Sequence, residues 1–154
     1  MRQRWLPVGV LALVLFVINV VARLVTRWRY PDDARAQDWI TVLMLAAVGL
    51  VALGVAAWWA RRYPTGRWTL DLALAALTGL LLAVFVGPFI SGTTPFAFGA
   101  GVFFKQIWQW AGFVGVGALV GFLVVTAFGL DYRSESLRRF AQSRLARPRR
   151  VVRR

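Results

Sequence analysis

The stretch that decides the fold is residues 72–104, LALAALTGLLLAVFVGPFISGTTPFAFGAGVFF, in which 33 consecutive positions carry no charged side chain. A hydrocarbon core about 30 Å thick needs about 20 apolar residues in a helix that rises 1.5 Å per residue. One helix of this length would be too long, and Gly87 and Pro88 interrupt it, because proline lacks an amide donor and disfavours helix in the preceding residue. We therefore predict a membrane-spanning helix over residues 70–90, followed by a non-helical connection.

Three shorter runs without a charged side chain accompany this stretch. Each is 18 to 25 residues long, which suits a single helix across a bilayer. Only helices and closed β-barrels cross a bilayer, and these continuous runs lack the alternation of barrel strands. Asp38 and Thr69 are placed to cap the second and third helices. We therefore predict an all-α membrane protein whose transmembrane domain, residues 1–130, contains four helices at 5–22, 39–60, 70–90 and 106–130.

The composition agrees with a membrane protein and excludes several kinds of site. Hydrophobic residues make up 59% of the 154-residue chain and charged residues 16%, whereas soluble proteins carry about 25% charged residues. The chain contains no cysteine and no histidine, which excludes disulfides, zinc sites with nitrogen or sulfur ligands, and catalytic groups built on those residues. We therefore expect no enzymatic activity, no cofactor and no metal site.

Basic residues are distributed unequally between the two sides of the predicted bundle. The N-terminus, the second loop and the tail together contain 14 arginines, whereas the first and third loops contain four arginines and Lys105. Loops rich in lysine and arginine stay in the cytoplasm. We expect both termini to be cytoplasmic and the protein to lie in the plasma membrane. The abundance of Arg, Ala, Val, Leu and Gly favours a bacterial source.

All eight tryptophans lie within a few residues of a predicted helix end. Tryptophan is enriched where a membrane meets water, because its indole ring is apolar and its N–H is polar. We therefore expect all eight to anchor the helices at that interface: Trp5, Trp28, Trp39, Trp58, Trp59, Trp68, Trp108 and Trp110.

Small residues recur at four-residue spacing in two of the predicted helices. Such stripes allow helix backbones to approach closely in lipid. We expect the third and fourth helices to form the tightest pair, and the stripes to serve either this bundle or an interface with another subunit. The stripe residues are Ala75, Gly79, Ala83 and Gly87 in the third helix, and Gly117 and Gly121 in the fourth.

Three residues in or beside the apolar runs are candidates for a polar site. Asp71 is either a proton or cation site, or a partner of Arg67 near the start of its helix. Asn19 is expected to hydrogen-bond to another helix, or else to bind a substrate. Lys105 is expected either to extend towards water before the fourth span or to lie in a longer helix that begins near Phe96.

The segment 91–104 is unusually apolar for a loop, because it has no charge and four phenylalanines. An apolar surface of this kind is rarely left exposed to water. We expect the segment either to cover the end of the bundle or to contact a partner protein or lipid through Phe96, Phe98, Phe103 and Phe104.

The tail, residues 131–154, combines apolar and basic side chains. Leu137, Phe140 and Leu145 are spaced as one face of a helix, which Pro148 should end. We predict a short amphipathic helix on the cytoplasmic leaflet, bound to anionic lipid rather than to nucleic acid. The arginines expected to contact lipid head groups are Arg138, Arg139, Arg144, Arg147, Arg149 and Arg150.

These features favour a non-enzymatic accessory or scaffold subunit that assembles with another, larger integral membrane protein. The low polar content of the spans supports this interpretation. A lipid-modifying enzyme is disfavoured, because the few acids are too sparse to form a catalytic group. The alternative is a small oligomeric transporter or channel, for which the polar lining would be Asp71, Asn19, Thr78, Gln106 and Gln109.

Overall fold

A computed structural model of the chain describes residues 2–97 and 99–145, with side chains for residues 5–97 and 99–143. No strand occurs among the described residues. Four segments are long and apolar enough to cross a membrane: Trp5–Arg29, Ala34–Arg62, Thr65–Ile90 and Ala100–Ser143. The prediction of an all-α, multi-pass membrane protein with four spanning helices is therefore confirmed.

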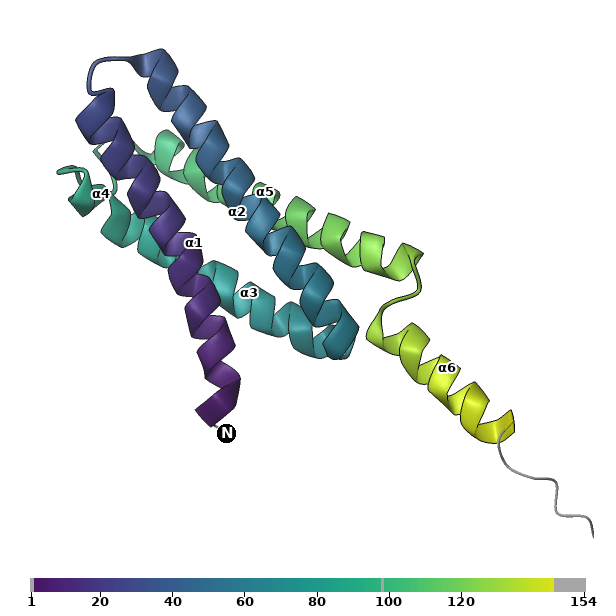
Figure 1. Cartoon of the computed structure of the whole chain (residues 1–154). Helices are drawn as coiled ribbons and strands as arrows, with labels where there is room; N and C mark the ends of the chain where they lie inside the picture. Colours follow the sequence, from purple (N-terminus) through teal and green to yellow (C-terminus); the bar gives the residue numbers. More distant parts are fainter. Residues whose placement is uncertain (1, 98, 146–154) are drawn as a thin grey trace, which may run out of the picture.

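The long helices run up and down, so the start of α1 and the end of α5 lie at the same end of the bundle (Figure 1). We call this the tail end. The opposite end, which holds the α1–α2 loop, α4 and the start of α5, is the loop end. In chain order the elements are α1 (Arg2–Arg29), α2 (Ala34–Arg62), α3 (Thr65–Leu81), the π-helical turn η1 (Leu82–Val86), α4 (Gly87–Ile90), α5 (Ala100–Ala127) and α6 (Tyr132–Leu145).

The long helices extend beyond the charge-free runs from which they are predicted. α1 continues to Arg29 rather than to residue 22, and α5 begins at Ala100 rather than at residue 106. A charged side chain marks the limit of the hydrocarbon, whereas a helical backbone can continue into the interface until a proline or glycine stops it. Pro31 follows the end of α1, and Gly99, with a φ of 85°, precedes α5.

Both predicted N-caps are wrong, because the two helices begin earlier than their charge-free runs. Asp33, and not Asp38, caps α2, since its side chain accepts a hydrogen bond from the amide of Ala36 at 3.0 Å. α3 begins at Thr65, so Thr69 already lies inside the helix. The Thr69 hydroxyl donates to the Thr65 carbonyl oxygen at 2.8 Å, as serine and threonine commonly do within helices.

The tightest contact pairs α2 with α5, so the expected pairing of the third and fourth helices is wrong. A Cβ atom on Gly117 would collide with the carbonyl oxygen of Gly49, and one on Gly121 with that of Leu53. The GxxxG motif of α5 therefore brings two backbones into direct contact, as such motifs do in lipid. Gly49 has no side chain and the buried Ala52 has a small one, so the backbone of α2 is open to this close approach.

α3 packs against α1 instead. A Cβ atom on Gly79 would lie 3.2 Å from the Cβ atom of Leu15 and 3.4 Å from the carbonyl oxygen of Ala12. Ala75 and Ala83, from the same stripe of small residues, are completely buried. The stripe of the third span therefore lies inside the bundle.

Three of the eight tryptophans are core residues rather than interfacial anchors. Trp59, Trp68 and Trp110 are only 7%, 4% and 2% exposed. The ring of Trp68 lies 5.6 Å from that of Phe122, measured between centroids. Nearness to a helix end does not reveal which face of the helix a residue occupies. The tryptophans whose exposure agrees with anchoring are Trp5, Trp28, Trp39, Trp58 and Trp108.

We expect Gly117→Ala to destabilise the protein by about 1–3 kcal/mol, because the added methyl group must push α2 and α5 apart. Thermal unfolding in detergent micelles should show a lower midpoint. Gly115→Ala is the matched control on the same helix, since a Cβ atom there meets no atom within 4 Å. Equal midpoints for the two variants would contradict the α2–α5 contact.

Candidate functional site

The third span loses regular helical hydrogen bonding at the loop end. In the π-helical turn η1, the amide of Gly87 donates to the carbonyl oxygen of Leu82, five residues earlier. An α-helix would direct this amide to Ala83. The carbonyl oxygen of Ala83 therefore loses its usual donor, the amide of Gly87, and the next residue, Pro88, has no amide hydrogen to replace it. Irregular backbone at membrane depth must find donors elsewhere.

Arg23 of α1 supplies donors to this break. Its Nη2 lies 3.4 Å from the carbonyl oxygen of Ala83, and its Nη1 lies 3.4 Å from the hydroxyl oxygen of Ser91, just after α4. A guanidinium holds five N–H donors in a fixed fork, so one side chain can serve several acceptors. The half-buried Arg23 thus gives the Ala83 carbonyl a donor that its own helix does not provide, and it also reaches the Ser91 hydroxyl.

Asn19 positions Arg23 from one helical turn away. Its side chain is 1% exposed, and its Oδ1 accepts a hydrogen bond from Nε of Arg23 at 2.9 Å. Its Nδ2 donates to Sδ of Met44 on α2 at 3.1 Å. A buried amide without partners is costly, and here both of its polar atoms are bonded. Asn19 therefore links α1 to α2 and, through Arg23, to the broken third span.

Gly87 leaves the room that this polar pair occupies. A Cβ atom at this position would lie 2.8 Å from Nε of Arg23 and 2.9 Å from Oδ1 of Asn19, closer than Cβ atoms come to other heavy atoms. Its four-residue spacing places Gly87 in the stripe of small residues. The structure shows that polar side chains, rather than an apolar helix face, make the close approach.

Arg27, one turn after Arg23, attaches α4 to α1. Its Nη1 donates to the carbonyl oxygen of Ile90 at 2.8 Å. Ile90 is the last residue of α4, and the final carbonyls of a helix have no donors within it. The two arginines together therefore hold the interrupted end of the third span against α1.

A cavity of about 600 Å³ lies beside these arginines at the loop end. Of the described residues that line it, Arg23, Arg27 and Lys105 are cations and Asp38 is an acid. Lys105 lies inside α5, as expected if it belongs to a longer helix rather than preceding the fourth span. That helix begins at Ala100 and not near residue 96. Its side chain lines the cavity, as do the neutral polar residues Thr41, Gln106 and Gln109.

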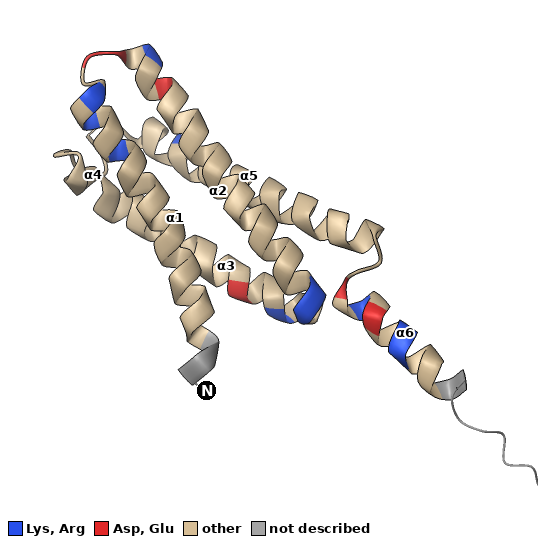
Figure 2. Cartoon of the chain, viewed as in Figure 1, with Lys and Arg blue, Asp and Glu red and all other residues tan. Residues whose placement is uncertain are grey.

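The residues proposed as the lining of a transport pathway do not meet in one place. Asn19, Gln106 and Gln109 line the loop-end cavity, whereas Asp71 and Thr78 do not. Asp71 lies near the start of α3, at the tail end of the bundle, where charged residues gather again (Figure 2). The Thr78 hydroxyl donates to a carbonyl oxygen of its own helix at 2.9 Å. These side chains therefore occupy separate environments.

The apolar segment that follows α4 packs partly on itself. The ring of Phe103 lies 4.7 Å from that of Phe96, 5.6 Å from that of Phe104 and 6.1 Å from that of Phe85 in η1. Phe103 is half-buried, whereas Phe96 and Phe104 are 60% and 59% exposed. Phe98 lies outside the described residues. Phe103 thus covers part of the loop end, and contact of the exposed rings with a partner or lipid stays a prediction.

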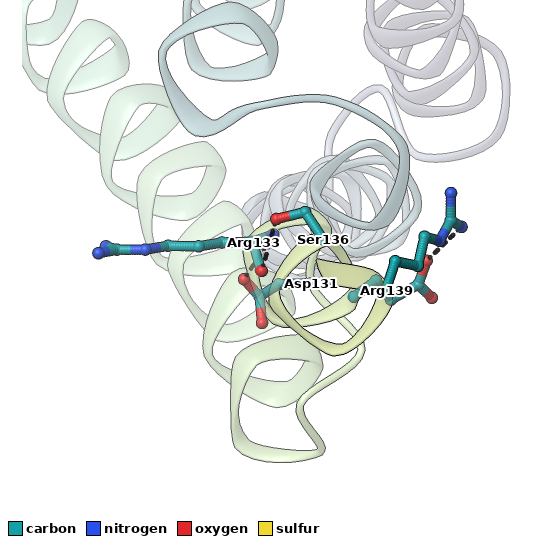
Figure 3. Close-up of polar contacts among 5 residues, drawn as sticks. Asp131, Arg133, Ser136 and Arg139 are labelled. Atoms are coloured by element: carbon teal, nitrogen blue, oxygen red, sulfur yellow. Dashed lines mark hydrogen bonds and ion pairs between the residues drawn. The ribbon is translucent and has the colours of Figure 1, made fainter. Parts of the chain in front are cut away.

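α6 lies outside the four-helix bundle and extends away from it (Figure 1). Asp131 fixes its first turn by accepting hydrogen bonds from the amides of Arg133 and Ser134, at 3.2 and 3.3 Å, and from the Ser134 hydroxyl at 2.5 Å. Glu135 and Arg139, one turn apart, form an ion pair at 3.2 Å (Figure 3). The helix therefore has local support that does not depend on the bundle.

The side chains of α6 include exposed apolar and basic groups. Leu137 and Phe140 are 61% and 57% exposed. Near the end of α2, Arg61, Arg62 and Arg139 line a shared hollow of about 620 Å³. Arg138 and Arg139 are exposed. The parts of the predicted lipid-binding set that lie outside the described residues are the side chain of Arg144 and the residues Arg147, Arg149 and Arg150.

No protein-family model matches the chain, and no curated protein or solved structure is significantly similar to it. Only the geometry of its sites therefore bears on function. Among the described residues, no three acidic side chains are grouped so that they could hold a metal ion. The candidate functional site is the cluster of Asn19, Arg23 and Arg27 together with the adjoining cavity.

Arg23 and Arg27 are missing from the site residues predicted from the sequence, because they follow the first charge-free run and count there as loop charges. The signal that identifies them is spacing. Asn19, Arg23 and Arg27 recur every four residues, which places them on one face of a helix. A later span of the chain contains a Gly-Pro pair, and its proline leaves carbonyl oxygens without amide donors. A polar face on an earlier helix therefore indicates side chains that donate to those carbonyls.

We expect Asn19→Leu to lower stability by about 1–2 kcal/mol, because it removes the acceptor that holds Nε of Arg23. The midpoint of thermal unfolding in micelles should fall. Thr78→Val is the control, since the Thr78 hydroxyl bonds within its own helix. If both variants unfold at the same temperature, the Asn19–Arg23 pair does not stabilise the bundle.

Proposed function

We propose that this protein is a non-enzymatic accessory subunit of a larger membrane protein complex in the plasma membrane. The observation that carries the proposal is a groove of about 540 Å³ between α3 and α5. The groove exists because α3 packs on α1 and α5 packs on α2. We infer that a transmembrane helix of a second, different protein occupies it.

The lining of the groove supports this occupant. α5 contributes Ala111, Gly115 and Ala118, which lie on one helix face and leave its backbone nearly uncovered. Close backbone approach at small residues is how helices associate in lipid. The groove follows α3 from Thr65 to Leu80, which is about 22 Å along the helix axis and covers most of a membrane core.

We expect a photo-crosslinking residue at position 76, inside the groove, to join the protein to one partner of fixed mass in its native membrane. Gly115→Leu should abolish this crosslink, because leucine fills the groove. Gly112→Leu is the matched control on the same helix but outside the groove, and it should leave the crosslink intact.

Neither leucine should prevent folding, since a Cβ atom at either glycine meets no atom within 4 Å. Crosslinks to lipid alone, or to a second copy of this chain, would contradict the assignment as an accessory subunit.

We further propose that both termini face the cytoplasm. Charged residues gather at the two ends of the bundle and are scarce between them (Figure 2). Arg61 and Arg62 end α2 and Arg67 lies in the first turn of α3, so all three flank the short α2–α3 connection, and α6 follows at the same end. The α1–α2 connection instead carries Asp32 and Asp33. The positive-inside rule supports a cytoplasmic tail end. The exposed apolar and basic residues of α6 support its contact with anionic lipid of the same leaflet.

Because the chain has no native cysteine, single-cysteine labelling can report its orientation without background. We expect a membrane-impermeant maleimide to label Asp32→Cys and Ala97→Cys in intact cells. Gly66→Cys and Gln142→Cys should react only after permeabilisation. All four positions are exposed. The reverse pattern would invert the proposed orientation, and labelling of all four in intact cells would contradict the placement of the two ends of the bundle on opposite sides of the membrane.

A further inference from the structure

We propose that the loop-end cavity is a binding site for a phosphate-type oxyanion, carried either by a lipid head group or by a soluble molecule. The site is distinct from the groove between α3 and α5 and from α6, so it does not depend on the accessory-subunit proposal. The cavity measures about 600 Å³ and is lined from α1, α2, α5 and the segment after α4.

The cavity carries an excess of positive charge. Arg23, Arg27 and Lys105 line it, and the acid in its lining is Asp38. Among the described residues, none of these three cations forms an ion pair, although an ion pair does form between Glu135 and Arg139 on α6. Cations within or beside a membrane span are expensive unless a counter-charge accompanies them. An anion in the cavity supplies that counter-charge.

The hydrogen bonds of Arg23 leave its charge unopposed. All three of its bonds are to neutral groups: the amide of Asn19, the carbonyl of Ala83 and the hydroxyl of Ser91. A guanidinium has five N–H donors, so two remain for a ligand. The ammonium group of Lys105 has three donors, and no described residue accepts a hydrogen bond from it. The cavity therefore presents charged donors from two different helices.

The position of Arg23 is fixed before any ligand arrives. Asn19, which is 1% exposed, accepts a hydrogen bond from its Nε, and the missing side chain of Gly87 leaves the space that it occupies. A preorganised ligand contact costs less side-chain entropy on binding. The planar fork of arginine matches two oxygens of a phosphate, and a lysine adds a point charge. Gln106 and Gln109 offer neutral donors for the remaining oxygens.

The cavity walls also include apolar surface. Ile40, Met44 and Val102 lie in the lining with the polar groups. This combination fits an organic phosphate whose hydrocarbon portion contacts the apolar wall. The phosphate group is common to a phospholipid head group and to a soluble phosphate, and the two sources are separated by experiment.

The test uses the full-length protein in neutral detergent, with phosphatidylglycerol and inorganic phosphate as separate probes. Native mass spectrometry counts the phosphatidylglycerol molecules retained, and calorimetric titration measures phosphate binding. Lys105→Gln should lose one retained lipid or bind phosphate at least about tenfold more weakly, since a charge-assisted hydrogen bond is removed. Lys105→Arg, which keeps the charge, should restore binding.

Arg35→Gln is the matched control, because it removes one positive charge at the same end but outside the cavity lining. Lipid held by α6 is unaffected by either substitution, so the difference between the variants reports the cavity alone. Loss of one lipid in Lys105→Gln assigns a lipid head group, and loss of phosphate binding alone assigns a soluble anion. Both outcomes support the site. Equal binding of both probes by Lys105→Gln and Arg35→Gln overturns it.

Lys105→Gln should fold normally, since no described residue accepts a hydrogen bond from this lysine. An unchanged thermal midpoint would show that any loss of binding is local.

Discussion

Inside hydrocarbon no water is available to bond a carbonyl whose helical partner is missing, and the third span of this protein contains such a carbonyl. Pro88 offers no amide, and the π-helical turn before it moves the amide of Gly87 away from Ala83. Arg23 approaches from α1 to provide donors, and Asn19 holds it there. A proline, a glycine, an asparagine and an arginine, drawn from two spans, thus form one set whose members depend on each other.

This set also explains why the four helices pair as they do. The arginines of α1 attach it to the third span, while the glycines of α5 fit only against the low surface of α2. The two pairs meet through Asn19 and Met44. α3 and α5 meet at the rings of Trp68 and Phe122, and an apolar groove runs between them. The cationic cavity forms where α1, α2 and α5 surround the broken end of the third span. Both proposed binding sites follow from the same arrangement.

The number and approximate place of the spans could be predicted from the sequence, because a long absence of charge reports directly on the surrounding solvent. The pairing could not be predicted, since small residues occur on α2, α3 and α5, and their spacing identifies a face without identifying its partner. Asn19 and Lys105 were recognisable as polar residues near apolar runs. Arg23 was not, because its role depends on the broken end of another span, 60 positions later in the chain.

That separation along the chain has a consequence for how the protein is made. Ser91 follows Arg23 by 68 positions. At about 5–20 residues per second, the ribosome completes this acceptor roughly 3–14 s after the arginine. Until then Asn19, one turn away on the same helix, is the acceptor that α1 itself offers to the guanidinium. The bonds that attach α1 to the broken end of the third span can therefore form only after that span has been made.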